Sequence, residues 1–152
     1  MLLDDVQARI ASTVTELPDE RLQFAAELAE LIRRDALPNA PISAYLLDGG
    51  TRPVGDGQSG AGFFIQAVEQ RVAVVVIFNS AGDVTGGKVV GRADELLDRL
   101  TRGMVGWAPA GDAEHVYTTD FRFGGSDPAA LSAGRAMYQL EFAIGLQLRI
   151  LT

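Results

Sequence analysis

Apolar residues near the C-terminal end of the chain occupy every second position without interruption. The alternation runs from Tyr138 to Ile150, and the interleaved positions include glutamine, glutamate and arginine. Period-two alternation is typical of a strand with one buried face. We expect a strand of about thirteen residues, spanning about 40 Å at roughly 3.3 Å per residue, where five or six residues are usual. Such a strand either extends beyond its own domain or bends at Gly145.

Three other segments have the apolar spacing of amphipathic helices. Residues 3–16 carry two aspartates in the first turn, where the helix dipole favours them, and Pro18 closes the segment. A second helix is predicted over 24–35 and a third over 89–104. Residues 20–24 fit either the start of the second helix or an extended lead-in to it.

Strands are expected between the helices as well. Residues 42–48 form a short apolar run, and 63–79 end in the nearly continuous β-branched sequence RVAVVVIF, typical of a strand covered on both faces. Residues 114–124 alternate aromatic and polar side chains. The order of elements predicts an α+β fold in a single domain over 1–152. We expect a mostly antiparallel (mixed) sheet of about four strands, packed against two to three helices.

The segment Gly49–Gly62 interrupts this pattern. Glycine is its commonest residue, and Val54 is its one large hydrophobic side chain. A segment of this composition buries too little apolar surface to order itself. We therefore predict a long loop or flexible arm over 49–62, and loops of this length in small domains usually have a function.

Charge and composition narrow the possible functions. The chain of 152 residues has a formal net charge of −7, no cysteine and one histidine. Disulfides, thiol nucleophiles and cysteine-containing zinc sites are therefore excluded. No run of basic residues provides the patch that nucleic-acid binding requires. No apolar run reaches the roughly 18–20 residues that span a bilayer, and we expect a protein without a signal peptide or membrane segment.

Two short motifs resemble catalytic or cofactor-binding signatures. Gly55–Gly60 spells GxGxxG, but a predicted strand follows it, whereas dinucleotide binding requires a helix whose N-terminus receives the pyrophosphate. Ser59 lies in GQSGA, which lacks one glycine of the nucleophile elbow. A catalytic triad would have to use His115, which is better explained as a surface or interface histidine. We expect no cofactor.

Clustered carboxylates are the remaining candidates for chemistry. Asp94, Glu95 and Asp98 share one helical face with Arg99 and Arg102, which can balance their charge. A solvated helix face explains this cluster better than a magnesium site. The same interpretation, as turn and strand-surface charges, applies to Asp112, Glu114 and Asp120. The sequence therefore predicts no catalytic and no metal-binding residue.

Trp107, the one tryptophan, follows the predicted third helix in the sequence GWAPAG. A tryptophan at the end of an element most often anchors the next loop against the core. The alternative is a contact between subunits, and the sequence leaves both open.

Taken in order, these pieces resemble a known family. They are the N-terminal helix LLDDVQARI, the helix FAAELAEL, the proline-flanked strand LPNAPISAYLL, the glycine-rich segment, EQRVAVVVIFNSAGDVTGG, MVGWAP at 104–109 and AMYQLEFAIGLQLRI. This layout is similar to that of the tail terminator, or tail completion, proteins of siphophages and prophages. The resemblance covers nearly the whole chain, and its most specific parts are MVGWAP and YQLEF.

The resemblance implies a structural protein of the virion, at the head–tail interface, assembled in the host cytoplasm. Such proteins form a homohexameric ring that caps the tail tube, stops its polymerisation and offers a joining surface to the neck. The implied partners are further copies of the chain, the major tail tube protein and a head-completion or stopper protein. Double-stranded DNA would pass through the lumen without specific binding. Six copies at −7 each carry −42, which suits a channel that does not hold DNA.

The resemblance assigns no catalytic residue, and we place the contacts to the tube or to a neighbouring subunit in the glycine-rich segment. The residues expected to make them are Gly49, Gly50, Thr51, Arg52, Pro53, Val54, Asp56, Gln58 and Trp107. The long terminal strand is a second candidate, because an exposed edge is a template for pairing. Two alternatives remain. One is another neck or tube-completion subunit, and the other is a cytosolic small-molecule-binding domain that closes the glycine-rich loop over a ligand.

Overall fold

A computed structural model of the chain describes residues 2–18, 21–25, 33, 41–79, 87–130 and 135–151. All structural statements below concern these ranges. Most of the second predicted helix (24–35) lies outside them. Its first residue does not begin a helix, because Phe24 belongs to a short strand.

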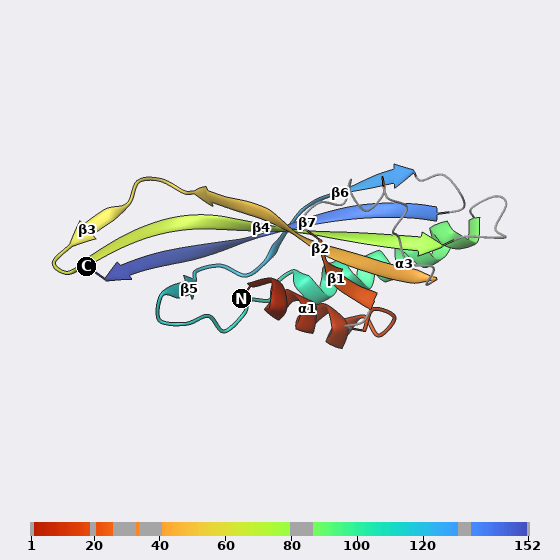
Figure 1. Cartoon of the computed structure of the whole chain (residues 1–152), viewed down its shortest axis with the longest axis horizontal. Coiled ribbons are helices and arrows are strands. Elements are labelled where there is room, and N and C mark those ends of the chain that lie inside the picture. Colours follow the sequence, from red (N-terminus) through yellow and green to blue (C-terminus); the bar gives the residue numbers. More distant parts are fainter. Residues whose placement is uncertain are drawn as a thin grey trace.

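A single mixed sheet forms the body of the molecule (Figure 1). Its strands are β1 (Leu22–Phe24), β2 (Ile42–Pro53), β3 (Gln58–Gly60), β4 (Phe63–Asn79), β5 (His115–Tyr117), β6 (Arg122–Ala130) and β7 (Arg135–Leu151). The order is β1-β2-β4-β7-β5, with β3 also pairing with β4 and β6 with β7. β1 is parallel to β2, and the other pairs are antiparallel.

The two longest strands, β4 and β7, lie side by side along their whole length. Their pairing runs from Phe63 opposite Leu151 to Asn79 opposite Arg135 without a register shift. The predicted strands over 63–79 and over the C-terminal alternation are therefore confirmed, and β7 is longer than its sequence pattern indicated. Gly145 does not interrupt the pairing of β7 with β4.

Two helices, α1 (Leu2–Thr13) and α3 (Gly87–Met104), lie on one face of this sheet. α1 turns Val6 and Ile10 inward, and α3 turns Leu96 and Leu100 inward. These side chains meet the sheet positions that alternate toward them. The buried sheet residues of this core include Leu46, Val72, Val74, Val76, Phe78, Leu140, Phe142 and Ile144. We call this side of the sheet the helix face.

The opposite side, which we call the open face, has a smaller buried cluster of its own. Tyr45, Val75, Ile77 and Met137 form it, with Ala25 and Leu47 at its margin. Buried side chains on both faces explain why RVAVVVIF is nearly continuously apolar, since the positions from Val74 to Phe78 belong alternately to one cluster and the other.

The predicted strand over 114–124 is wrong as a single element. His115–Tyr117 forms β5 and Arg122 begins β6, while Thr118–Phe121 connects them along the same edge of β7. The remainder of β6 has the sequence GGSDPAA, which is depleted in strand-forming residues. Pairing with β7 makes it a strand. The predicted α+β fold is confirmed, and the mixed sheet has seven strands where about four were expected.

The predicted flexible arm over 49–62 is also wrong as a loop without regular structure. β2 continues to Pro53, and Gln58–Gly60 forms β3, so that both pair with β4. Backbone hydrogen bonds to a neighbouring strand need no apolar side chains, and composition alone therefore failed to reveal them.

These strands project beyond the helices at one end of the molecule, where the C-terminal end also lies (Figure 1). We call this part the sheet extension, and it consists of residues 51–60, 63–70 and 145–151. Among the described residues, seven large hydrophobic side chains are well exposed, and four of them belong to the extension. They are Val54 (54%), Phe63 (41%), Ile150 (53%) and Leu151 (83%).

Candidate functional site

The structure brings most of the predicted interface residues together in one place. Six of the nine, from Thr51 to Gln58, lie in the sheet extension, and Gly49 and Gly50 immediately precede them in β2. Trp107 lies elsewhere, after α3. The predicted set is therefore one continuous surface segment and one separate residue.

A bulge in β2 forms the base of this segment. The register of β2 on β4 shifts between Asp48 and Thr51, and Gly50 there has a φ of 88°. The Asp48 carboxylate accepts a hydrogen bond of 2.8 Å from the Gly50 amide. A Cβ at position 49 would lie 2.8 Å from Cβ of Arg71, so that only glycine permits this approach. The glycines let β2 bend and continue as part of the extension.

Two further glycines of the segment lie under aromatic rings. A Cβ on Gly57 would collide with the ring of Phe64, and one on Gly60 would collide with the ring of Phe63. The rings thus cover bare backbone on β3, a packing that holds a glycine-rich strand in place. The glycine content of this segment predicted a flexible arm, but in the structure these two glycines make room for aromatic rings that pack on the backbone.

Trp107 anchors the end of α3 within its own chain. Its ring stacks on Phe121 at a centroid distance of 5.8 Å and an interplanar angle of 14°. The Arg9 guanidinium lies 5.4 Å from the ring, and the Phe121 amide donates to the Trp107 carbonyl at 2.8 Å. These contacts support the anchoring interpretation of Trp107, and its contact with another subunit stays a prediction.

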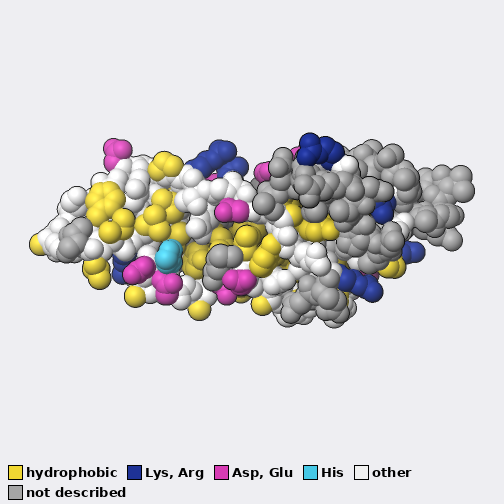
Figure 2. Space-filling model, in the orientation of Figure 1, with side chains coloured by type: hydrophobic (Ala, Val, Ile, Leu, Met, Phe, Trp, Pro, Cys, Tyr) yellow, Lys and Arg dark blue, Asp and Glu magenta, His cyan; other side chains and the backbone are white. Residues whose placement is uncertain are grey.

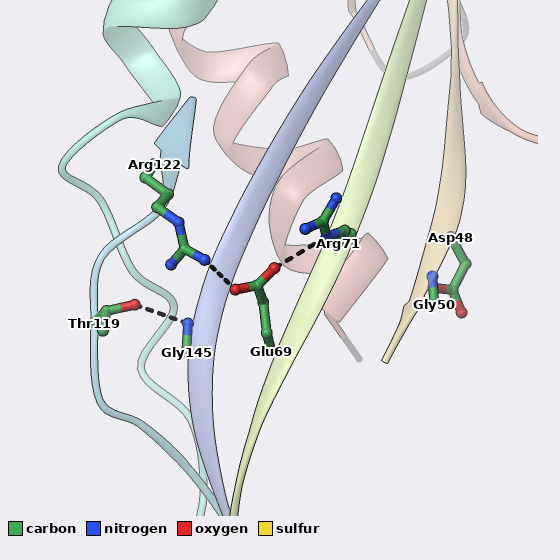
Figure 3. Close-up of polar contacts among 7 residues, drawn as sticks. All are labelled: Asp48, Gly50, Glu69, Arg71, Thr119, Arg122 and Gly145. Carbon is green, nitrogen blue, oxygen red and sulfur yellow. Dashed lines mark hydrogen bonds and ion pairs between the residues drawn. The ribbon is translucent and has the colours of Figure 1, made fainter. Parts of the chain in front are cut away.

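At the base of the extension, two arginines surround Glu69 on the open face (Figure 3). Glu69 accepts from Nε of Arg71 at 2.9 Å and forms a second ion pair with Arg122 on β6. Burial, the largest single influence, raises the pKa of Glu69, but the bonds from both arginines outweigh it, and the pKa lies below its usual value. One carboxylate thus lies between two guanidiniums.

Two more arginines share this face. Arg52 on β2 is the register partner of Glu69, and Arg149 on β7 is the register partner of Ile65. Paired residues in antiparallel strands point to the same side. Arg52 is exposed and has no ion partner among the described side chains, while Arg149 donates to Gln147 at 2.8 Å. Arg52 was predicted from the sequence, but the other arginines were not, since only the strand register brings them to one face.

On the helix face, the structure has a hollow of about 460 Å³ at the base of the extension. It is surrounded by the N-terminal turn of α1, the middle of β2 and of β4, and the segment from Ala110 through β5. Leu2, Leu3 and Val72 give it an apolar floor. Its lining also includes three carboxylates and one imidazole, from Asp5, Asp48, Asp112 and His115. Figure 2 shows the histidine with acidic side chains beside it.

Short-range bonds fix part of this lining. Asp112 accepts from the amides of Glu114 (2.9 Å) and His115 (2.8 Å), and from Nδ1 of His115 at 3.0 Å. Hydrogen bonding to the His115 side chain is the main cause of the lowered pKa of Asp112. Burial raises the pKa of Tyr117, and the charges of Asp5 and Asp112 add to this shift. Carboxylates are therefore the main charged groups around the hollow.

The candidates for chemistry have structural explanations. GxGxxG at 55–60 spans a turn and β3, and strand β4 follows it, as predicted. His115 is exposed at the start of β5. On α3, Asp98 pairs with Arg102 at 2.9 Å as expected, but Arg99 pairs with Glu16 instead of the carboxylates of its own helix. Within the described ranges, no group of three or more histidine or acidic residues is arranged to hold a metal ion.

Comparison with known proteins then decides the family. A family model described as phage tail terminator protein matches residues 3–152. The chain belongs to this family. Membership places it among the structural proteins of phage virions, in the tail. No curated protein matches the sequence. Within the described part of the chain, no helix is long and apolar enough to cross a membrane.

Two solved structures align with the chain at low sequence identity. A chain of the virion of a native gene transfer agent particle aligns with a TM-score of 0.52 and 14% identity, covering 93% of this chain and 91% of that one. The core region of PilO from the type IV pilus system of Pseudomonas aeruginosa aligns with a TM-score of 0.20 and 12% identity, covering 84% of this chain and 95% of that one. The first likeness supports the fold alone, and the second carries no argument.

Proposed function

We propose that this protein is a non-enzymatic tail terminator that forms a homohexameric ring at the head-proximal end of the tail tube. The ring stops tube polymerisation and offers the surface on which a head-completion or stopper protein joins. The observation that carries this proposal is the family match over nearly the whole chain. The shared fold of a chain from a gene transfer agent virion supports it.

The distribution of surface features supports an assembly role over a catalytic one. The sheet extension exposes apolar side chains that a soluble monomer usually buries, which is typical of a protein–protein contact. The polar clusters on both faces consist of ion pairs and turn bonds, without a nucleophile held by a base among the described residues. In this proposal, the extension contacts the tube or a neighbouring subunit, as does Trp107.

The test is capping of tail tubes in vitro. Polymerising tail tube protein with the purified chain should give rings at tube ends in negative-stain images, and tubes should stop growing. The variant Val54→Asp places a charge on the exposed extension and should reduce capping while leaving the circular dichroism spectrum unchanged. A matched control is Val105→Asp, since Val105 is equally an exposed apolar residue, outside the extension. Tubes that keep growing with bound wild-type protein would contradict the proposal.

Two alternatives have their own readouts. Another neck or tube-completion subunit would bind tails or heads without stopping polymerisation. A cytosolic small-molecule-binding domain would remain monomeric and gain thermal stability from a nucleotide or metabolite. DNA is expected to pass through the lumen without specific binding, and a filter-binding assay at low salt checks this.

A further inference from the structure

The two faces of the sheet carry opposite charge near the base of the extension. On the open face, the four arginines 52, 71, 122 and 149 outnumber the three carboxylates of Glu69, Asp127 and Glu141. On the helix face, the hollow is lined by three carboxylates and no arginine or lysine. The chain as a whole has a net charge of −7, so that a locally cationic face on it is unusual.

Apolar surface accompanies the charge on both sides. Phe63 and Leu151 are register partners on the open face, and both are exposed. Leu2, Leu3 and Val72 form the floor of the hollow. At about 460 Å³, the hollow is within the range of about 300–1,000 Å³ that accommodates ligands or several side chains. Each surface thus offers a partly apolar contact with a charged rim, the usual anatomy of an interface.

From this charge complementarity we infer that the open face of the extension, with Arg52 at its exposed rim, docks on the acidic hollow of a second copy of this chain. This inference rests on the proposed ring. The two surfaces lie on opposite sides of one sheet, so that a contact between them is heterologous, and every copy keeps one free surface of each kind for the next. In a closed ring, both surfaces of every copy are occupied by its neighbours.

Arg52 and Asp5 are the residues best suited to test this contact. Arg52 has no ion partner among the described side chains, and Asp5 is exposed on the first turn of α1. By contrast, Asp48 and Asp112 hold turns and Arg71 and Arg122 hold Glu69, so that changing them would disturb the fold. Reversing one charge at a heterologous interface places like charges opposite each other in every contact of the ring.

The experiment uses the full chain with Arg52→Glu, with Asp5→Arg, and as a mixture of these two variants. Each variant alone should associate at least about tenfold more weakly than wild type, measured by light scattering and by counting rings, free or on tail tubes. The equimolar mixture should recover rings, because each contact in an alternating ring then joins opposite charges. Matched controls are Arg92→Glu and Asp94→Arg, which reverse exposed charges on α3.

The outcomes separate this inference from the proposed function. If both variants form rings as well as wild type does, or if the mixture fails to recover what each variant loses, the inferred contact is wrong while the ring stands. If wild-type protein forms no ring either alone or on tubes, the proposed function itself is wrong. Loss of rings with each variant alone, recovery in the mixture and unchanged rings with the α3 variants support the contact. Weakening of the contact at high salt is expected for an exposed charge pair.

Discussion

The carboxylate of Glu69 on β4 pairs with Arg122 on β6, although β7 runs between these two strands (Figure 3). The register partner of Glu69 on β7 is Gly145, which has no side chain to obstruct the reach. The Gly145 amide donates to Oγ1 of Thr119 at 2.7 Å, and the Thr118 amide donates to the Gly145 carbonyl at 2.9 Å. The same glycine thus lies opposite Glu69 and holds the connection from β5 to β6 through both of its backbone groups.

Gly145→Val should destabilise the fold. A Cβ at this position would lie 3.0 Å from Cγ2 of Thr119 and 3.1 Å from Oγ1 of Thr118, tighter than ordinary contact. We expect a loss of about 1–3 kcal/mol in the free energy of unfolding, typical of overpacking. Urea denaturation measures it. In a Thr119→Ala background the penalty should shrink, since the closest atom is gone, and strictly additive losses would contradict this explanation.

The ion pair between Glu16 and Arg99 should make the stability of the fold decrease at acidic pH. The pairing with Arg99 lowers the pKa of Glu16 from 4.5 to about 2. A lowered folded-state pKa stabilises the fold above the unfolded value and loses this effect as pH falls toward the folded value. Glu16→Gln should therefore reduce the melting temperature at pH 7, and the difference from wild type should vanish between about pH 4.5 and 2. Solvent screening keeps the effect small, because both side chains are about one-third exposed.

The control for this pH series is Asp94→Asn, which removes an exposed carboxylate from α3. The difference in melting temperature between this variant and wild type should stay the same across this pH window. A Glu16→Gln difference that stays constant down to pH 2 would show that the pair does not carry the acid dependence.

Gly57→Ala should loosen β3 without unfolding the core. The added methyl group occupies the place of the Phe64 ring, which must then turn away from the strand. We expect a cost of about 1 kcal/mol, in the range of cross-strand packing. Faster hydrogen exchange of the amides over 58–66, with unchanged exchange in α1, checks it. Adding Phe64→Ala should remove most of the difference between Gly57 and alanine, and a full difference in that background would contradict the contact.

Trp107→Ala should destabilise the chain itself rather than only its assembly. The indole stacks on Phe121 and lies against Arg9, and truncating it opens a gap at the end of α3. A half-buried tryptophan should cost about 2–3 kcal/mol, less than the 3–5 of a fully buried one. Thermal unfolding of dilute protein measures this cost. An unchanged melting temperature together with lost ring formation would instead favour the intersubunit interpretation.

The sequence predicted the elements whose side chains alternate regularly. β4 was expected over 63–79 and has these bounds, and the helices expected over 3–16 and 89–104 differ by at most three residues at either end. Periodicity works here because each element has one side facing the same core. Val14 and Leu17 remain buried after α1 ends at Thr13, which explains why the pattern suggested a longer helix.

The sequence could not predict elements that depend on a neighbour. β3 and the second half of β6 contain glycine, proline and aspartate, and only the backbone groups of β4 and β7 make them strands. The candidate site shows the same limit. Thr51–Gln58 was identified from its composition, whereas Arg71, Arg122 and Asp5 gave no signal, because their proximity to the extension depends on register and on how α1 packs.

The unbroken register of β4 on β7 fixes the conformation of the sheet extension as well as that of the core. β4 ends in the helix-covered core and β7 begins there. Each strand spans roughly 55 Å at about 3.3 Å per residue. A shift of one residue at the far end would turn every core side chain of the strand to the wrong face. The extension is thus already ordered before any partner arrives. Its association loses little conformational entropy, an advantage in affinity that a flexible arm of the same composition would lack.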